Sequence, residues 1–181
     1  MSKKIKLILG SVRQGRVGAP IAEWLVNVAK ESGVDVEVLD LKEVNLPKFE
    51  SAVSPMYAAV DTPEAKAWAA QIAEADGLIF LTSEYNRSIP ASLKDAIDYL
   101  YTEWNGKRAS IVSYGWIDGG ASATKHLTDI LNWVKIELVA PSVAIKFTPE
   151  TFNESGQFKD INTSLGAIQQ DFLSQLKLLN S

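Results

Sequence analysis

The stretch from Asp76 to Tyr101 constrains the fold more than any other part of the chain. Residues 77–81 are apolar and uncharged, which is typical of a strand covered on both faces of a sheet. A polar loop over 82–88 follows, and Pro90 then stands near the first turn of a predicted helix, where its missing N–H costs nothing. Open α/β sheets bind their ligands where such buried parallel strands end. The stretch therefore predicts a ligand site.

The same alternation of strand and helix runs through the whole chain. Strands are predicted over residues 5–9, 34–39, 77–81, 108–114 and 141–145. Helices are predicted to start at Pro20, Pro63 and Pro90, after the glycine-rich loop 115–120, and before Leu165. We expect one α/β domain over residues 1–181, a three-layer sandwich with a five-stranded parallel sheet in the order 2-1-3-4-5 and helices on both faces. The carboxyl ends of strands one, three and four would then line one crevice.

Two segments break this pattern. Residues 40–63 contain three prolines together with several apolar side chains, which indicates a lid, a binding loop or an oligomer contact, or else a loop packed over its own side chains. Residues 147–160 look like a loose excursion with a turn at Ser155-Gly156.

Composition excludes several classes of function. The net charge of −4 argues against a nucleic-acid partner, because phosphate backbones are held largely by clustered Lys and Arg. The chain has no apolar run of the ~18 residues that span a bilayer, and its N-terminus lacks the pattern of a secretory signal. Without cysteine, thiolate catalysis and Cys-ligated metals are excluded, and we expect no metal site. His126, the single histidine, is expected to be structural or on the surface, and the protein to be cytoplasmic.

The first of the three crevice loops suits a phosphate. Ser11 and the backbone N–H groups ahead of the helix can donate hydrogen bonds, while Arg13 or Arg16 neutralises the charge. The loop lacks both the Walker sequence and the full G-x-G-x-x-G spacing. A solvated arginine loop is the alternative.

The other two loops suit a flat heterocycle. A planar ligand could stack on Tyr85 while Asn86 reads its polar edge, and the flexible backbone after Ser113 lets a ring approach closely. Glu84 has an alternative role, in which it caps a nearby turn or pairs with a lysine. Together the loops describe a site for one phosphate and one ring system, and flavin mononucleotide (FMN) fits best.

Three motifs carry a family resemblance. Residues 10–13, residues 84–98 with the pattern E-Y-N-x-S-x-P-x-x-L-K, and residues 113–120 resemble the NADPH-dependent FMN reductase family, over roughly residues 4–145. That family has the flavodoxin-like fold and includes quinone, azo-dye and chromate reductases. The resemblance implies bound FMN, NADPH or NADH as reductant, and a homodimer or homotetramer with flavins near the interface.

The resemblance also implies which residues bind the cofactor. They are Ser11, Arg13, Arg16, Val17 and Gly18 around the phosphate, Ser83, Glu84, Tyr85 and Asn86 at the isoalloxazine, and Ser113, Tyr114 and Gly115 along its other side. The sequence departs from the family at two positions. Many members have proline in place of Ser83, and that proline fixes the loop backbone. Many also have arginine near Thr128, and its absence here bears on tetramer assembly or on affinity for the nicotinamide nucleotide.

The implied activity is an oxidoreductase in which NAD(P)H gives hydride to flavin N5 and a small-molecule electron acceptor, such as a quinone, an azo compound or free flavin, takes the electrons. Because the flavin carries the chemistry, no catalytic side chain is expected. Backbone donors from Tyr114 and Gly115 could stabilise charge on the reduced ring. The alternatives are a flavodoxin-type electron carrier, which Arg13 and Arg16 argue against, and a flavin-binding module that senses redox state.

Overall fold

The structure is a computed structural model that describes residues 3–181. Its centre is a parallel sheet in the order β2-β1-β3-β4-β5, with β6 paired to β4. This is the strand order of the flavodoxin-like fold, so the predicted fold class is confirmed. The strands are β1 (Ile5–Leu9), β2 (Val36–Asp40), β3 (Gly77–Ser83), β4 (Arg108–Gly115), β5 (Glu137–Leu138) and β6 (Val143–Lys146).

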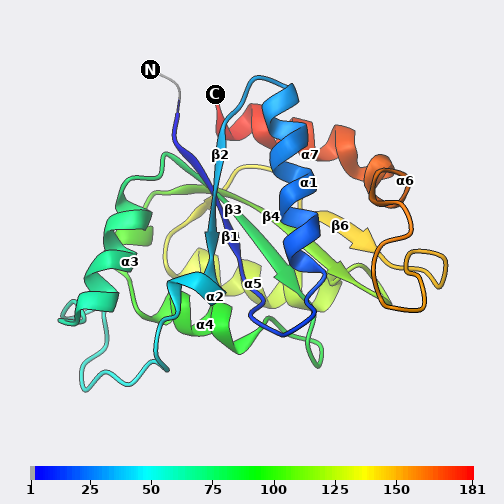
Figure 1. Ribbon diagram of the computed structural model, residues 1–181. Coiled ribbons are helices and arrows are strands. Elements are labelled where there is room, and N and C mark those ends of the chain that lie inside the picture. Colours follow the sequence, from blue (N-terminus) through cyan, green and yellow to red (C-terminus); the bar gives the residue numbers. More distant parts are fainter. Residues whose placement is uncertain (1–2) are drawn as a thin grey trace.

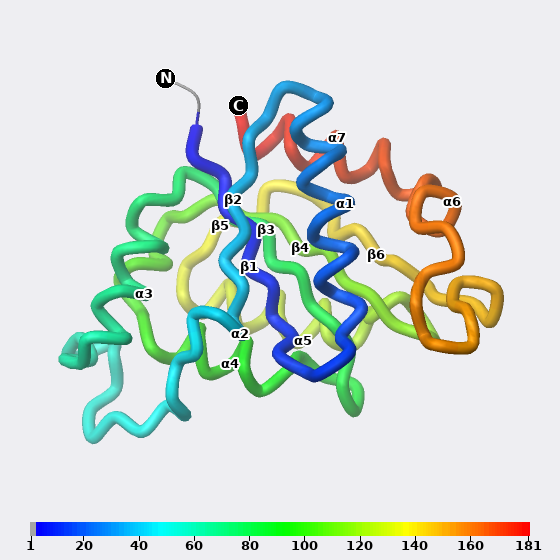
Figure 2. The backbone as a smooth tube through the Cα atoms, in the orientation of Figure 1, coloured from blue at the N-terminus to red at the C-terminus, as the bar shows by residue number. Residues whose placement is uncertain are grey.

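Helices cover both faces of the sheet (Figures 1 and 2). One face carries α1 (Gly18–Glu31), α6 (Ile161–Leu165) and α7 (Gln169–Leu179), and the other carries α3 (Pro63–Ala73), α4 (Ala91–Asp98) and α5 (Ala121–Trp133). The short α2 (Leu41–Val44) follows β2, and single 3-10 turns lie at Thr102–Trp104 and Gly166–Ile168.

The sheet has a separate hydrophobic core on each face, because successive side chains of a strand point to opposite sides. In β3, which is buried along its whole length, Leu78 and Phe80 pack toward α3, α4 and α5, whereas Ile79 and Leu81 pack toward α1 and α7. This double burial explains why the strand reads as a continuous apolar run in the sequence.

The fifth position of the sheet differs from the prediction of a single strand. β5 and β6 both pair with β4, and the chain leaves the ladder between them around Pro141, which has no N–H to donate. Gln175 of α7 lies at this gap in the ladder. Its buried side-chain amide donates to Ile111 O (3.0 Å) and Pro141 O (2.7 Å). A side chain from the distant C-terminal helix thus satisfies carbonyls that the broken ladder leaves without partners.

Two predicted helix boundaries are confirmed, and two differ. Thr62 caps α3 by accepting from Ala65 N at 3.2 Å, and Gly33 ends α1 with φ +83°. However, α1 starts at Gly18, two residues before Pro20. The predicted C-terminal helix is interrupted by the 3-10 turn at Gly166–Ile168, where a glycine weakens helical propensity.

Residues 45–62 behave partly as a packed loop. Phe49 meets Tyr99 of the core edge-on, with ring centroids 5.4 Å apart. The tip of the segment is exposed, with Tyr57 81% accessible.

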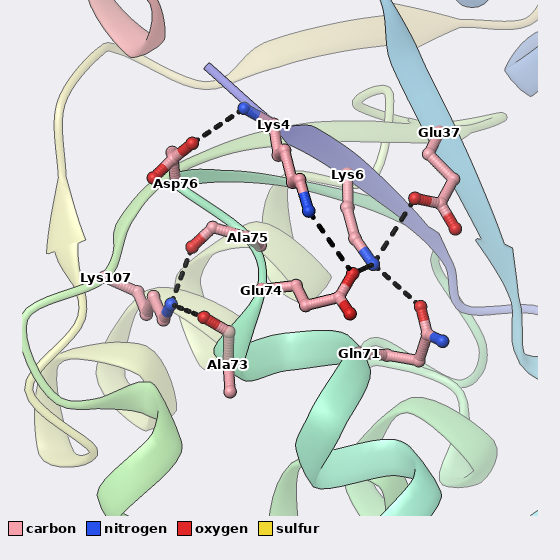
Figure 3. A network of polar contacts seen from close by, with 9 residues as sticks. All are labelled: Lys4, Lys6, Glu37, Gln71, Ala73, Glu74, Ala75, Asp76 and Lys107. Atoms are coloured by element: carbon pink, nitrogen blue, oxygen red, sulfur yellow. Dashed lines mark hydrogen bonds and ion pairs between the residues drawn. The ribbon is translucent and has the colours of Figure 1, made fainter. Parts of the chain in front are cut away.

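A buried lysine joins three elements at the amino ends of the strands, opposite the predicted crevice (Figure 3). Lys6 of β1 is only 1% exposed. Its Nζ lies 2.7 Å from Gln71 Oε1, 3.3 Å from Glu37 Oε2 and 3.4 Å from Glu74 Oε2. The ammonium therefore links β1 to β2 and to α3 and plays no part in the ligand site.

Candidate functional site

A cavity of about 660 Å³ opens where β1, β3 and β4 end, a size usual for small-molecule sites. Three loops and one later segment enclose it. Its lining residues are Arg13, Gly15, Arg16, Val17, Ser83, Glu84, Tyr85, Tyr114, Gly115, Trp116, Phe147, Pro149, Phe152, Asn153, Glu154, Ser155 and Gly156. The crevice lies where the strand order predicts it.

Most of the predicted cofactor residues line this cavity, and the others lie directly beside it. Ser11 is buried, and its Oγ is 2.6 Å from the Tyr85 hydroxyl, which joins the first loop to the second. Ser113 is also buried and donates to Gly119 O at 2.7 Å. Gly18, Ser11 and Ser113 lie outside the lining but are buried next to lining residues, whereas Asn86 lies outside it in an exposed turn.

The two arginines of the first loop have different environments. Arg16 forms a bidentate ion pair with Asp40, at the end of β2, and also donates to Ser11 O at 2.6 Å. Asp40 therefore already neutralises its charge. Arg13 is exposed and takes part in no ion pair within residues 3–181. Of the two, Arg13 is the guanidinium that remains available to an anion.

Tyr114 closes the floor of the cavity. Its hydroxyl and the hydroxyl of Ser83 are buried close to each other, and neither forms a well-aligned hydrogen bond with a residue of 3–181. Burial raises the pKa of Tyr114 to about 12, so the phenol stays protonated at neutral pH and can donate. A Cβ at Gly18 would lie 2.4 Å from this hydroxyl, so glycine is needed there. Buried hydroxyls that lack well-aligned partners fit a ligand with oxygen acceptors, such as a phosphorylated sugar chain.

The second loop is a tight turn held at both ends. Tyr85 and Ser88 exchange backbone hydrogen bonds of 2.9 and 3.0 Å, and both residues between them have positive φ, with Asn86 at +49° and Arg87 at +66°. This is the geometry of a two-residue hairpin turn, which asparagine tolerates well and arginine does not. His126 of α5 contacts Ser88 Oγ at 3.0 Å, a structural contact in agreement with the role predicted for this histidine.

Glu84 caps α5. Its Oε2 accepts from Ser122 N at 3.0 Å and Ala123 N at 3.2 Å, in the first turn of the helix. The alternative that the sequence left open for this carboxylate, a cap, is thus the one present in the structure. The cap also fixes the second loop to the element that follows the third loop.

Loss of this cap should destabilise the fold measurably. We expect Glu84→Ala to lower the free energy of unfolding by about 1–2 kcal/mol, because two helix N–H groups lose an acceptor and the helix dipole loses a negative charge. Glu84→Gln retains an acceptor and should lose about half as much. Urea denaturation of both variants measures this; equal stability of Glu84→Ala and wild type would contradict the assigned cap.

Sequence reasoning missed one wall of the cavity. The segment 147–156 forms it next to Trp116 of the third loop, although that segment reads as a loose excursion. The available signal was the repeated phenylalanine at 147, 152 and 158 in an otherwise polar stretch. Their contact with Trp116 depends on tertiary structure, which no local pattern reveals.

Residues 3–181 contain neither a candidate metal site nor a candidate membrane-spanning helix. No group of three or more His, Asp or Glu side chains there could hold a metal ion. No helix of this part of the chain has the length and apolar character needed to cross a bilayer.

The profile of the NADPH-dependent FMN reductase family matches residues 3–150, which include all three loops. The chain belongs to this family. An NAD(P)H-dependent FMN reductase of Nectria sp is 42% identical over 146 residues, which cover 77% of this chain and 72% of that protein. A quinone reductase of Escherichia coli (strain K12) is 33% identical over 165 residues, which cover 83% and 85% of the two chains.

A solved structure agrees with the fold. The flavoenzyme NAD(P)H:(acceptor) oxidoreductase FerB from Paracoccus denitrificans superposes with a TM-score of 0.74 at 24% identity and covers 98% of this chain and 97% of its own. Membership of the FMN reductase family confirms three predictions: that the protein is an oxidoreductase, that its cofactor is FMN, and that NADPH or NADH is the reductant.

Proposed function

We propose that this FMN reductase catalyses the two-electron reduction of a quinone or a similar small acceptor, in which NAD(P)H, a proton and the quinone give NAD(P)⁺ and the hydroquinone. The meeting of three ligand-binding loops in one cavity is the observation that carries the proposal. The relative in Escherichia coli named a quinone reductase supports this acceptor class, and azo compounds and free flavins are related candidates.

The first loop would bind the phosphate of FMN. Backbone N–H groups at the start of α1, a helix of 14 residues, face the end of the cavity with partial positive charge. Arg13 adds a full charge that no described carboxylate neutralises, whereas Arg16 holds the loop in place through Asp40. The buried hydroxyl of Tyr114 would donate to an oxygen of the phosphate or the sugar chain.

The second and third loops would hold the ring system. The ring of Tyr85 and the backbone of Gly115 lie on the cavity wall, where a flat ring can approach. Ser83 supplies a second buried hydroxyl. Asn86, outside the cavity lining, would act by allowing the positive φ of the turn rather than by direct contact.

FMN, when bound, supplies hydride acceptance and release, and the chain supplies binding and electrostatics. The carboxylate of Glu84 is committed to the α5 cap and is not free to transfer protons. Backbone N–H groups of the Tyr114–Gly115 stretch would stabilise negative charge on the ring. No side-chain acid or base is required by this scheme.

A flavodoxin-type electron carrier remains the second candidate, since it shares the strand order. Arg13 in the first loop favours the reductase over the electron carrier.

A redox-sensing module would need a partner whose binding changes on reduction. For the reductase, we infer a homodimer or homotetramer, supported by the exposed apolar side chains of Val53, Met56 and Tyr57. We also infer that it acts in the cytoplasm.

Anaerobic mixing of the FMN-loaded protein with NADPH or NADH tests the function. We expect the flavin absorbance to bleach within seconds and to recover when a benzoquinone is added. An electron carrier would bleach only over many minutes. A protein whose bound flavin stays oxidised under both nucleotides would contradict the reductase.

A further inference from the structure

The segment from Phe147 to Phe158, here called the aromatic arm, is an ordered hairpin between β6 and α6, visible as the yellow-to-orange loop in Figures 1 and 2. Asn153 N donates to Gln157 O at 2.9 Å, and Lys159 N donates to Thr151 O at 3.0 Å. At the tip, Asn153 Oδ1 accepts from both Ser155 N and Gln157 N at 3.0 Å. The predicted turn at Ser155-Gly156 is therefore present, but the expected loose excursion is instead held by its own hydrogen bonds.

The aromatic arm packs against Trp116 from the third loop. The Trp116 ring lies 5.9 Å from the Phe147 ring and 5.7 Å from the Phe152 ring, centroid to centroid. Phe152 also contacts Phe147 and Phe158, each at 4.9 Å. The indole is thus held from one side by two aromatic rings.

Trp116 is nevertheless 57% exposed, whereas Phe147 beneath it is 5% exposed. A tryptophan that served only as core packing would be buried as Trp68 and Trp104 are. A large aromatic ring that is fixed but exposed at the wall of a cavity is typical of a binding surface, because its ordering cost is already met before the ligand arrives.

The cations of the cavity lining, Arg13 and Arg16, come from the first loop. The aromatic arm contributes no cation to the lining, and its one charged residue there is Glu154. An uncharged flat ring suits the arm better than the phosphates of a dinucleotide do.

We propose that Trp116 and Phe152 of this wall form the platform on which a flat, uncharged acceptor of the quinone class stacks while it receives electrons. This inference rests on the proposed function. Phe152 lies beyond residues 3–150, the part of the chain that the family profile matches, whereas Trp116 lies within it. The platform would set the acceptor preference of this chain.

The test compares Trp116→Ala with Trp133→Ala. Trp133 is 71% exposed but ends α5, whose 13 residues carry it about 18 Å along the helix from the cavity end, so it is a matched control. Calorimetric titration of the oxidised, FMN-loaded protein with 2-methyl-1,4-naphthoquinone measures affinity directly. We expect Trp116→Ala to weaken it roughly tenfold, Trp116→Phe to restore most of it, and Trp133→Ala to leave it unchanged.

Kinetic measurements distinguish an effect on the reaction with the acceptor from an effect on the reaction with the nicotinamide nucleotide. Trp116→Ala should raise KM for the naphthoquinone by a similar factor and change the rate of flavin reduction by NADPH far less. Phe152→Leu, a second variant from the arm, should show the same split. Unchanged naphthoquinone affinity in Trp116→Ala, or an equal loss in the reaction with NADPH, would overturn the platform.

Failure of the platform and failure of the proposed function have different signatures. If the wild-type protein does not oxidise NADPH with any quinone, the proposed function is wrong and the platform falls with it. If the wild-type protein is active and the Trp116 variants match it, the platform alone is wrong.

Discussion

Gly18→Ala is expected to lower the free energy of unfolding by about 1–2 kcal/mol and to weaken FMN binding more than tenfold. The added methyl would lie 2.4 Å from the Tyr114 hydroxyl and 2.9 Å from Leu9 Cδ1. Overpacking of this kind destabilises a protein by about 1–3 kcal/mol. The higher helical propensity of alanine offsets this loss by up to about 1 kcal/mol. Tyr114 cannot move freely, because its ring packs against Phe147 at 5.8 Å. The cavity floor must therefore shift.

Two further variants make this prediction specific. Gly166→Ala places a methyl where no atom lies within 4 Å and should not reduce stability or FMN affinity. Adding Tyr114→Phe to Gly18→Ala removes the closest clash and should recover part of the lost stability without restoring FMN affinity. Chemical denaturation and FMN fluorescence titration measure both quantities. A Gly18→Ala protein that binds FMN as tightly as wild type would show that Tyr114 is not part of the site.

Lys6→Ala is expected to destabilise the protein by about 2–4 kcal/mol with little effect on FMN binding. The stem of this lysine is buried between β1 and α3, so truncation leaves a cavity of the kind made by large-to-small core substitutions. The electrostatic part is smaller. The side chains of Glu37 and Glu74 are 59% and 54% exposed, so removal of the ammonium leaves no buried charge without a partner (Figure 3).

Lys6→Met separates packing from charge. It keeps most of the buried stem and removes the ammonium, and we expect it to cost no more than about 1 kcal/mol. Denaturation at low and high salt gives the comparison. If Lys6→Met were as unstable as Lys6→Ala, the ion pairs, and not the packing of the stem, would hold β1 to α3.

The sheet and the three loops could be predicted because their signals are local. The continuous apolar run of β3, the Thr62 cap and the glycine at position 33 each act within a few residues. Parallel alternation then predicts a doubly wound sheet, and its flavodoxin-like order brings the three loops together. The pattern at residues 84–90 indicated the family for the same reason, since it contains one local turn, from Tyr85 to Ser88.

The parts that could not be predicted depend on long-range contacts. Asp40, which engages Arg16, lies 24 residues further along the chain. Gln175 completes a ladder 64 residues earlier. The aromatic arm reads as irregular because its hairpin and its contact with Trp116 have no helical or strand period.

A crystal structure of the protein with FMN tests the central claim most directly. The account predicts the phosphate within hydrogen-bonding distance of Ser11 and the first turn of α1, with Arg13 turned toward it. The ring system should lie between Tyr85 and Gly115, next to Trp116. FMN bound elsewhere on the chain, or a flavin whose phosphate lies away from the first loop, would contradict it.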